Sequence, residues 1–266
     1  MTQTVERMLP LYEAKMIHQY DHRWATYEPD GTVRDVTLVE KQDPSFVALP
    51  RYWVREEVVQ DRLPGTGKDW MLGYRWISNA TNERTLIAAK FPRTGTGNSL
   101  PIFAEHDDGD LVVAAMSSFV CDYVARQKLG GQNVTFGTVY QLAIPGVEKF
   151  LEPSPWAPSL PIATWIRARL HSLDNWPIPD RRYQVKAELD AAFFHLFGIA
   201  REDVDYIMDT FPIVKRKDEA AFGSYRTKEL ILEVFDAMQA AIEAGVPYAS
   251  SFDNPGSRPT EKDETF

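Results

Sequence analysis

The side chains best suited to bind a ligand or to take part in a reaction lie near the start of the sequence, between Leu9 and Tyr27. This segment interleaves tyrosines and Trp24 with two histidines and with the cations Lys15 and Arg23. Aromatic rings stack on nucleic-acid bases, while cations reach phosphate oxygens. The composition is therefore compatible with a surface that binds nucleic acid. The alternative is an amphipathic segment docked on a core, with its histidines and tyrosines half buried.

Three polar loops further along the chain, at 79–85, 96–99 and 126–133, carry side chains of the kind that read DNA. Asn, Gln and Arg hydrogen-bond to the edges of adenine and guanine. Glycines in two of these loops let backbone N–H groups approach phosphates. For any one loop, ordinary turn and cap residues are an equally good interpretation. Convergence of the three loops at one surface would distinguish DNA-reading loops from ordinary turns and caps.

Composition limits the classes of function. The chain has 266 residues, 44% of them hydrophobic, and a formal net charge of −9. A simple nucleic-acid binder is usually basic. However, residues 1–150 carry 16 Lys and Arg against 19 Asp and Glu, and the stretch 84–103 has three basic residues and no acidic one. A local basic face on an acidic molecule is therefore compatible with the sequence, with weak non-specific DNA binding.

The sequence argues against several other classes. The single Cys121 excludes an internal disulfide and a cysteine-cluster metal site, and we expect it in the core. No apolar run reaches the eighteen or so residues that cross a bilayer, and the N-terminus has no signal-peptide pattern. We therefore expect no membrane association and a cytoplasmic location.

No self-sufficient active site is evident. His18 and His22 have the spacing of one helix face, but Gln19 stands where a zinc enzyme would need Glu, and no third ligand is apparent. The sequence has no Gly-x-Ser-x-Gly nucleophile motif and no Asn/Asp-Pro-Pro-Tyr/Phe motif of the amino-methyltransferases. We therefore expect no catalytic residues, no metal and no cofactor in this chain.

The elements that position these residues follow from local patterns. Residues rich in Val, Ile, Thr and aromatics predict strands, and a 3–4 apolar spacing that ends at Gly130 predicts one helix over 110–128. A buried strand is predicted after that helix. The predicted strands are Thr32–Val39, Tyr52–Val59, Trp70–Ile77, Thr85–Phe91 and Val134–Ile144.

The second part of the chain is mostly helical in this interpretation. Residues 151–182 form a proline-rich connector that contains a helix at Ile162–Leu173. Further helices are predicted at Tyr183–Phe197, Arg201–Phe211 and Thr227–Ala244, and 251–266 is a polar tail. The predicted fold class is α+β: a β-rich α/β unit over 1–150, followed by a helical C-terminal unit over 183–250.

Four segments of the sequence resemble successive blocks of one family. The blocks are LPLYEAKMIHQYDHRWATY, WISNATNERTLIAAKFPRTGTGNS, AMSSFVCDYVARQKLGGQNVTFGTVYQLAIP and DTFPIVKRKDEAAFGSYRTKELIL. They resemble the C-terminal region of adenine-specific DNA methyltransferases of type IIG restriction–modification systems and related phage-defence methylases. The third block is also similar to the TaqI-like target-recognition domain. The blocks occur in the family's order and span most of residues 9–238.

The resemblance implies the specificity half of such an enzyme without its catalytic half. In the family, a separate region binds S-adenosylmethionine and carries the Asn-Pro-Pro-Tyr motif that holds the flipped adenine. The resemblance therefore implies double-stranded DNA and a methyltransferase domain or subunit as partners, with S-adenosylmethionine in that partner. Alone, this chain is expected to transfer no methyl group. The alternative is a protein-interaction subunit of a defence complex that makes no DNA contact.

We expect the DNA-facing residues to combine cations for phosphates with amides for base edges. Lys15, Arg23, Lys90, Arg93 and Lys128 are predicted mainly to contact phosphates, and Gln19, Asn98, Gln132 and Asn133 are the better candidates for base edges. The full candidate set is Lys15, His18, Gln19, His22, Arg23, Asn82, Arg84, Lys90, Arg93, Asn98, Lys128, Gln132 and Asn133.

Overall fold

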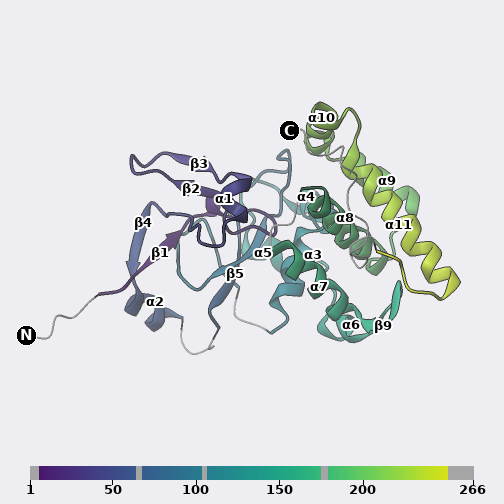
Figure 1. Cartoon of the computed structure of the whole chain (residues 1–266), viewed down its shortest axis with the longest axis horizontal. Coiled ribbons are helices and arrows are strands. Elements are labelled where there is room, and N and C mark those ends of the chain that lie inside the picture. The colour runs from purple at the N-terminus through teal and green to yellow at the C-terminus, as the bar shows by residue number, and fades with distance from the viewer. Residues whose placement is uncertain (1–5, 64–67, 104–106, 175–178, 251–266) are drawn as a thin grey trace, which may run out of the picture.

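The computed structural model describes residues 6–63, 68–103, 107–174 and 179–250. Figure 1 shows small sheets in the N-terminal part and a set of packed helices in the C-terminal part. The fold is therefore α+β, as the sequence predicts. The polar tail expected over 251–266 lies outside the described residues.

The N-terminal part is built from short, separate sheets. β1 (Met8–Tyr12) pairs antiparallel with β4 (Tyr52–Arg55) and parallel with β7 (Gly95–Thr96), giving the order β4-β1-β7. Two antiparallel pairs complete this part: β2 (Ala25–Tyr27) with β3 (Val33–Asp35), and β5 (Trp70–Tyr74) with β6 (Ala88–Pro92). Three short helical segments lie between the strands: η1 (Ala14–Met16), α1 (Leu38–Gln42) and α2 (Glu56–Arg62).

The hairpin of β5 and β6 contains a glycine that the packing requires. A Cβ atom on Gly73 would lie 2.7 Å from the carbonyl oxygen of Pro101. Gly73 lies opposite Ala89 on β6 and also bridges to Ile102 on the other side. Close backbone approach of this kind needs a residue without a side chain.

Helices α3 (Gly109–Ser117) and α4 (Phe119–Lys128) join the two parts of the molecule. Leu111 and Ala115 of α3 pack in the core formed with the C-terminal helices, while Val113 and Met116 pack with β5 and β6. The helix therefore lies between two cores, and its burial on both sides fixes the sheets relative to the helical part.

The C-terminal part is a helical bundle. Its core contains large aromatic side chains, among them Trp156, Trp165, Phe193 and Phe194, all buried. The longest helices, α8 (Pro179–Leu196) and α11 (Arg226–Ala244), pack along each other. The remaining elements are α5 (Phe136–Tyr140), α6 (Val147–Leu151), β8 (Pro153–Ser154), β9 (Ala157–Pro161), α7 (Ile162–Asp174), α9 (Arg201–Asp209) and α10 (Pro212–Phe222).

The strand predicted over Val134–Ile144 is wrong. Thr135 caps a short helix, α5, by accepting a hydrogen bond from the N–H of Thr138 at 3.2 Å. Only Val134 and Leu142 of this segment are buried, and Tyr140 is 84% exposed. A local cap therefore outweighs the β propensity of a mostly exposed segment.

The helix predicted over 110–128 is two helices. Ser118 has an extended backbone (φ −71°, ψ 152°), and its side chain caps α4 by accepting from the N–H of Cys121. Two predicted strands are also shorter than expected because helices follow them. A capping box of Thr37 and Glu40 starts α1, and Glu56 begins α2.

Candidate functional site

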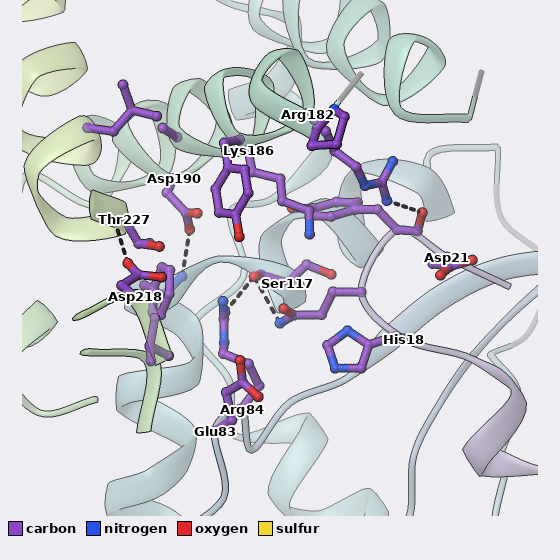
Figure 2. Close-up of a pocket in the computed structure, with 18 of the residues that line it drawn as sticks. His18, Asp21, Glu83, Arg84, Ser117, Arg182, Lys186, Asp190, Asp218 and Thr227 are labelled. Atoms are coloured by element: carbon purple, nitrogen blue, oxygen red, sulfur yellow. Dashed lines mark hydrogen bonds between the residues drawn. The ribbon is translucent and has the colours of Figure 1, made fainter. Parts of the chain in front are cut away.

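A cavity lies where the N-terminal segment meets the helical part, and Figure 2 shows its lining. Its volume is about 310 Å³, at the lower end of the range for small-molecule sites, roughly 300–1,000 Å³. His18 and Gln19 enter from the N-terminal segment, Arg84 from the loop before β6, and Lys186 and Asp190 from α8. The lining also includes exposed Leu38 and Pro179, so the cavity reaches the surface at that end.

Arg84 is part of the structural support of this cavity. Its Nε atom donates to Asp122 Oδ2 at 2.7 Å, and another N–H donates to the Ser117 carbonyl at 2.6 Å. The guanidinium also lies 3.8 Å from the ring centre of Phe119. Asp122 in turn accepts the backbone N–H of Thr85. Arg84 therefore ties the loop before β6 to the junction of α3 and α4, and its charge is neutralised inside the protein.

Gln19 has the same kind of structural role. Its amide donates to the carbonyls of Leu86 and Ser117 at 3.0 and 3.1 Å. The next residue, Tyr20, has a positive φ of 58°, an uncommon conformation outside glycine. Arg182 holds it there by donating to the Tyr20 carbonyl at 3.0 Å. The Gln19 side chain and the Tyr20 carbonyl thus hold the N-terminal segment to both parts of the molecule.

Lys186 and Asp190 are two ionisable groups of the cavity whose pKa values burial shifts strongly. Burial, followed by repulsion from Arg182 and Arg84, lowers the pKa of Lys186 to about 7. Burial raises the pKa of Asp190 to about 6, although Arg84 opposes the shift. Asp190 Oδ1 accepts the backbone N–H of Phe119 at 2.8 Å. Among the described residues, none forms a hydrogen bond or an ion pair with the Lys186 ammonium group.

The two histidines of the N-terminal segment are neutral near neutral pH. The His18 ring packs on Trp24 at 4.3 Å between centres, and burial with four nearby cations holds its pKa well below the usual range. Burial lowers the pKa of His22 to about 4, and its Nδ1 lies 3.4 Å from the hydroxyl of Tyr12. Neither ring supplies a positive charge for phosphate binding.

A second hollow, a shallow groove of about 550 Å³, lies on the N-terminal part. The exposed side chains of Asn98 and Asn133 line it together with Tyr52, Trp76 and Ile77. Tyr52 is 51% exposed and Ile77 is 63% exposed. We call this surface the amide–aromatic groove; Leu11, Glu13, Gly97 and Ser99 complete its lining.

The backbone explains why two distant loops meet in this groove. The N–H of Trp76 donates to the Ser99 carbonyl at 2.9 Å, and its carbonyl accepts from the N–H of Val134 at 2.7 Å. The N–H of Ser78 donates to the Gln132 carbonyl at 2.9 Å. The segment that follows β5 is therefore bonded on one side to the loop of Asn98 and on the other to residues 132–134.

The sequence-predicted candidates separate into three groups. Asn98 and Asn133 lie in the amide–aromatic groove, and exposed Gln132 adjoins it. His18, Gln19 and Arg84 line the cavity instead, with Gln19 and Arg84 buried. The third group, the remaining candidates, lies outside both the groove and the cavity lining.

Two of the remaining candidates support the fold. Arg23 donates to the carbonyls of Asp43, Phe46 and Lys41, and Arg93 donates to that of Leu63. Lys15, Lys90, Asn82 and Lys128 are exposed, with Lys90 over the ring of Trp70 at 5.0 Å. His22 lies with Lys90 at a separate hollow.

Sequence reasoning did not select Lys186 or Asp190. A signal for them was present: Arg182, Lys186 and Asp190 recur every four residues along α8, whose other buried residues are apolar apart from Glu188, the partner of Arg169. That spacing puts three charges in one row on the helix surface. A charged row on a core helix indicates an internal polar site rather than a solvated face.

Comparisons with protein-family models, with curated proteins and with solved structures gave no match for this chain. Within the described ranges, no three His, Cys, Asp or Glu side chains are grouped so that they could hold a metal ion. In the same residues, no helix has the length and apolarity needed to span a bilayer.

Proposed function

We propose that this chain is a DNA target-recognition unit that reads duplex DNA with its amide–aromatic groove. The observation that carries the proposal is the meeting of Asn98 and Asn133 in one groove. Both side chains are exposed, and Asn amides form paired hydrogen bonds with adenine. They come from loops far apart in the sequence, so local turn formation alone does not account for their proximity.

The groove also has the apolar surface that base contacts use. Tyr52 and Ile77 are half or more exposed, and Phe136, 50% exposed, packs edge-on against Trp76 at 5.5 Å. Exposed apolar groups next to amides suit contact with thymine methyls and base faces. The backbone bonds of the segment after β5 hold these groups rigidly, which lowers the entropic cost of binding.

Phosphate contacts would come from exposed cations of the N-terminal part. Arg51 is exposed and its guanidinium lies 5.4 Å from the ring centre of Tyr52. Lys15 and Lys128 are also exposed. Few cations on an acidic chain predict weak binding by the chain alone. We propose that a methyltransferase domain or subunit, with its S-adenosylmethionine, makes the remaining DNA contacts and supplies catalysis in a restriction–modification or phage-defence system.

The test is a selection of preferred sequences from a randomised duplex library by the wild-type chain and by the double variant Asn98→Ala, Asn133→Ala. We expect the wild type to enrich a motif and the variant to lose one or two positions of it. Each lost contact should weaken binding to the preferred duplex by about 1–3 kcal/mol. Binding to other sequences should change little.

Gln239→Ala on α11 is the matched control because it removes an amide far along the helical part, where Gln239 bonds Glu243. Its motif should equal that of the wild type. A wild type that enriches no motif, or a double variant that keeps the motif intact, would contradict target recognition by this groove. No DNA binding at all would instead favour a protein-interaction subunit.

A further inference from the structure

We propose that the cavity between the N-terminal segment and α8 binds a small organic anion, a carboxylate or a phosphate monoester on an apolar body, with the Lys186 ammonium group as its anchor. Figure 2 shows Lys186 extending from α8 into this space, with His18 and Arg84 on the other side. This site is separate from the amide–aromatic groove and does not depend on DNA binding.

The first support is the uncompensated charge of Lys186. No described side chain bonds its ammonium group, and a lysine in such surroundings normally has a partner. The four carboxylates among the described lining residues already have partners: Asp21 bonds Lys41 at 2.8 Å and Glu83 bonds Lys217 at 2.5 Å. Asp190 accepts the N–H of Phe119, and Asp218 accepts the N–H of Thr227. An anion in the cavity would provide the missing partner.

The second support is the positive sign of the electrostatic potential in the cavity. The environment of His18 is dominated, after burial, by the cations Lys186, Arg75, Arg84 and Lys41. Lys186 is itself repelled by Arg182 and Arg84, and each of these effects is larger than the attraction from Asp21 or from Asp190. Cations that repel one another in a low-dielectric space attract an anion strongly, and a cationic ligand would add to the repulsion.

The third support is the shape and apolar lining of the cavity. A volume of about 310 Å³ exceeds what a bare inorganic ion needs. Phe119, Val214, Leu230 and Ile231 form much of the wall. A ligand with an apolar body and one anionic group would bury that body against these side chains and reach Lys186 with the charge.

The experiment is calorimetric titration of the full chain with phenyl phosphate, benzoate, inorganic phosphate and benzylamine. We expect phenyl phosphate or benzoate to bind, inorganic phosphate to bind more weakly and benzylamine not to bind. The stronger of the two aromatic anions identifies the anionic group. Binding of benzylamine as tight as that of either anion, or no binding of either aromatic anion, would overturn the proposal.

Lys186→Met is the decisive variant. Methionine keeps the length and apolar volume while removing the charge, so the fold should survive, and thermal unfolding checks this. The variant should bind the preferred anion about tenfold more weakly or worse. Lys149→Met on α6, where Lys149 is paired with Glu152 outside the cavity, should bind like the wild type. Undiminished binding by a folded Lys186→Met variant would refute Lys186 as the anchor.

Discussion

Arg84 and Lys186 show how two cations around one cavity differ. Arg84 is 8% exposed and bonds a buried carboxylate, whereas Lys186 reaches the cavity with no bonded partner among the described residues. A buried ion pair contributes little over an apolar pair, but losing one partner leaves the other charge buried. Arg84 is thus required by the fold, and Lys186 is tolerated at a cost in stability.

Replacement of Arg84 with methionine should lower the free energy of unfolding by about 3 kcal/mol because Asp122 would lose its closest cation. Urea denaturation measures this change. Arg55→Met is the matched control, since Arg55 makes only an exposed pair with Glu6 at 3.8 Å, and should change stability by less than about 0.5 kcal/mol. Equal stabilities of Arg84→Met and wild type would show that Arg84 has no structural role.

Lys186 also predicts a pH dependence of stability. Its pKa is about 7 in the folded chain, against an ordinary 10.5, so the unfolded chain binds more protons between these values. The free energy of unfolding should therefore rise as pH increases from 7 to 9, with a slope of up to about 1.4 kcal/mol per pH unit. Asp190, with its raised pKa of about 6, acts in the opposite direction and only below that pH.

Urea denaturation at several pH values in this window tests the assignment. The slope should disappear in Lys186→Met and persist in Lys149→Met. Lys186→Met should also be more stable than wild type near neutral pH because it removes a half-buried charge that has no bonded partner among the described residues. If Lys186→Met keeps the full dependence of unfolding free energy on pH, the proton uptake on unfolding belongs to another group.

At the scale of elements, the sequence predicted the long amphipathic helices and the strands β5 and β6, although not their pairing. It failed where a single side chain starts a helix. Thr37, Ser118 and Thr135 each cap a helix within a segment whose apolar pattern suggested something else. α10 was not among the predicted helices, although the chain is helical from Pro212 to Phe222.

Replacement of Ser118 with alanine tests the strongest of these caps. Ser118 is 1% exposed and its hydroxyl accepts the N–H of Cys121, so its loss leaves that donor unsatisfied in the core. The free energy of unfolding should fall by about 1 kcal/mol. Ser172→Ala, inside α7, should leave stability unchanged or slightly higher because alanine favours helix interiors. A neutral Ser118→Ala variant would mean that packing alone sets the break between α3 and α4.

The candidate sites were only partly predictable for a related reason. Asn98 and Asn133 were selected by residue type, but only the bonds of Trp76 to both loops bring them together. Gln19 has the same chemistry as these residues and is buried, because the carbonyls of Leu86 and Ser117 accept hydrogen bonds from its amide. Residue type indicates what a side chain can bind, whereas tertiary contacts decide whether it is available.

At the scale of the whole molecule, charge limits how DNA is held. The net charge of −9 opposes long-range attraction to a polyanion, so the local groove and its few cations must supply the affinity. The helical part adds most of the acidity, with 13 Lys and Arg against 19 Asp and Glu over residues 151–266. This distribution favours a division of labour in which a partner domain contributes most phosphate contacts.

The measurement that tests the central claim most directly is equilibrium binding of the purified chain to a mixed-sequence duplex at low and at moderate salt. The account predicts measurable, weak binding at low salt that falls steeply as salt increases, because a few phosphate contacts release counterions. The Asn98→Ala, Asn133→Ala variant should keep this salt dependence on mixed-sequence DNA. Absence of binding at low salt, or binding that salt does not change, would contradict a DNA-contacting role for this chain.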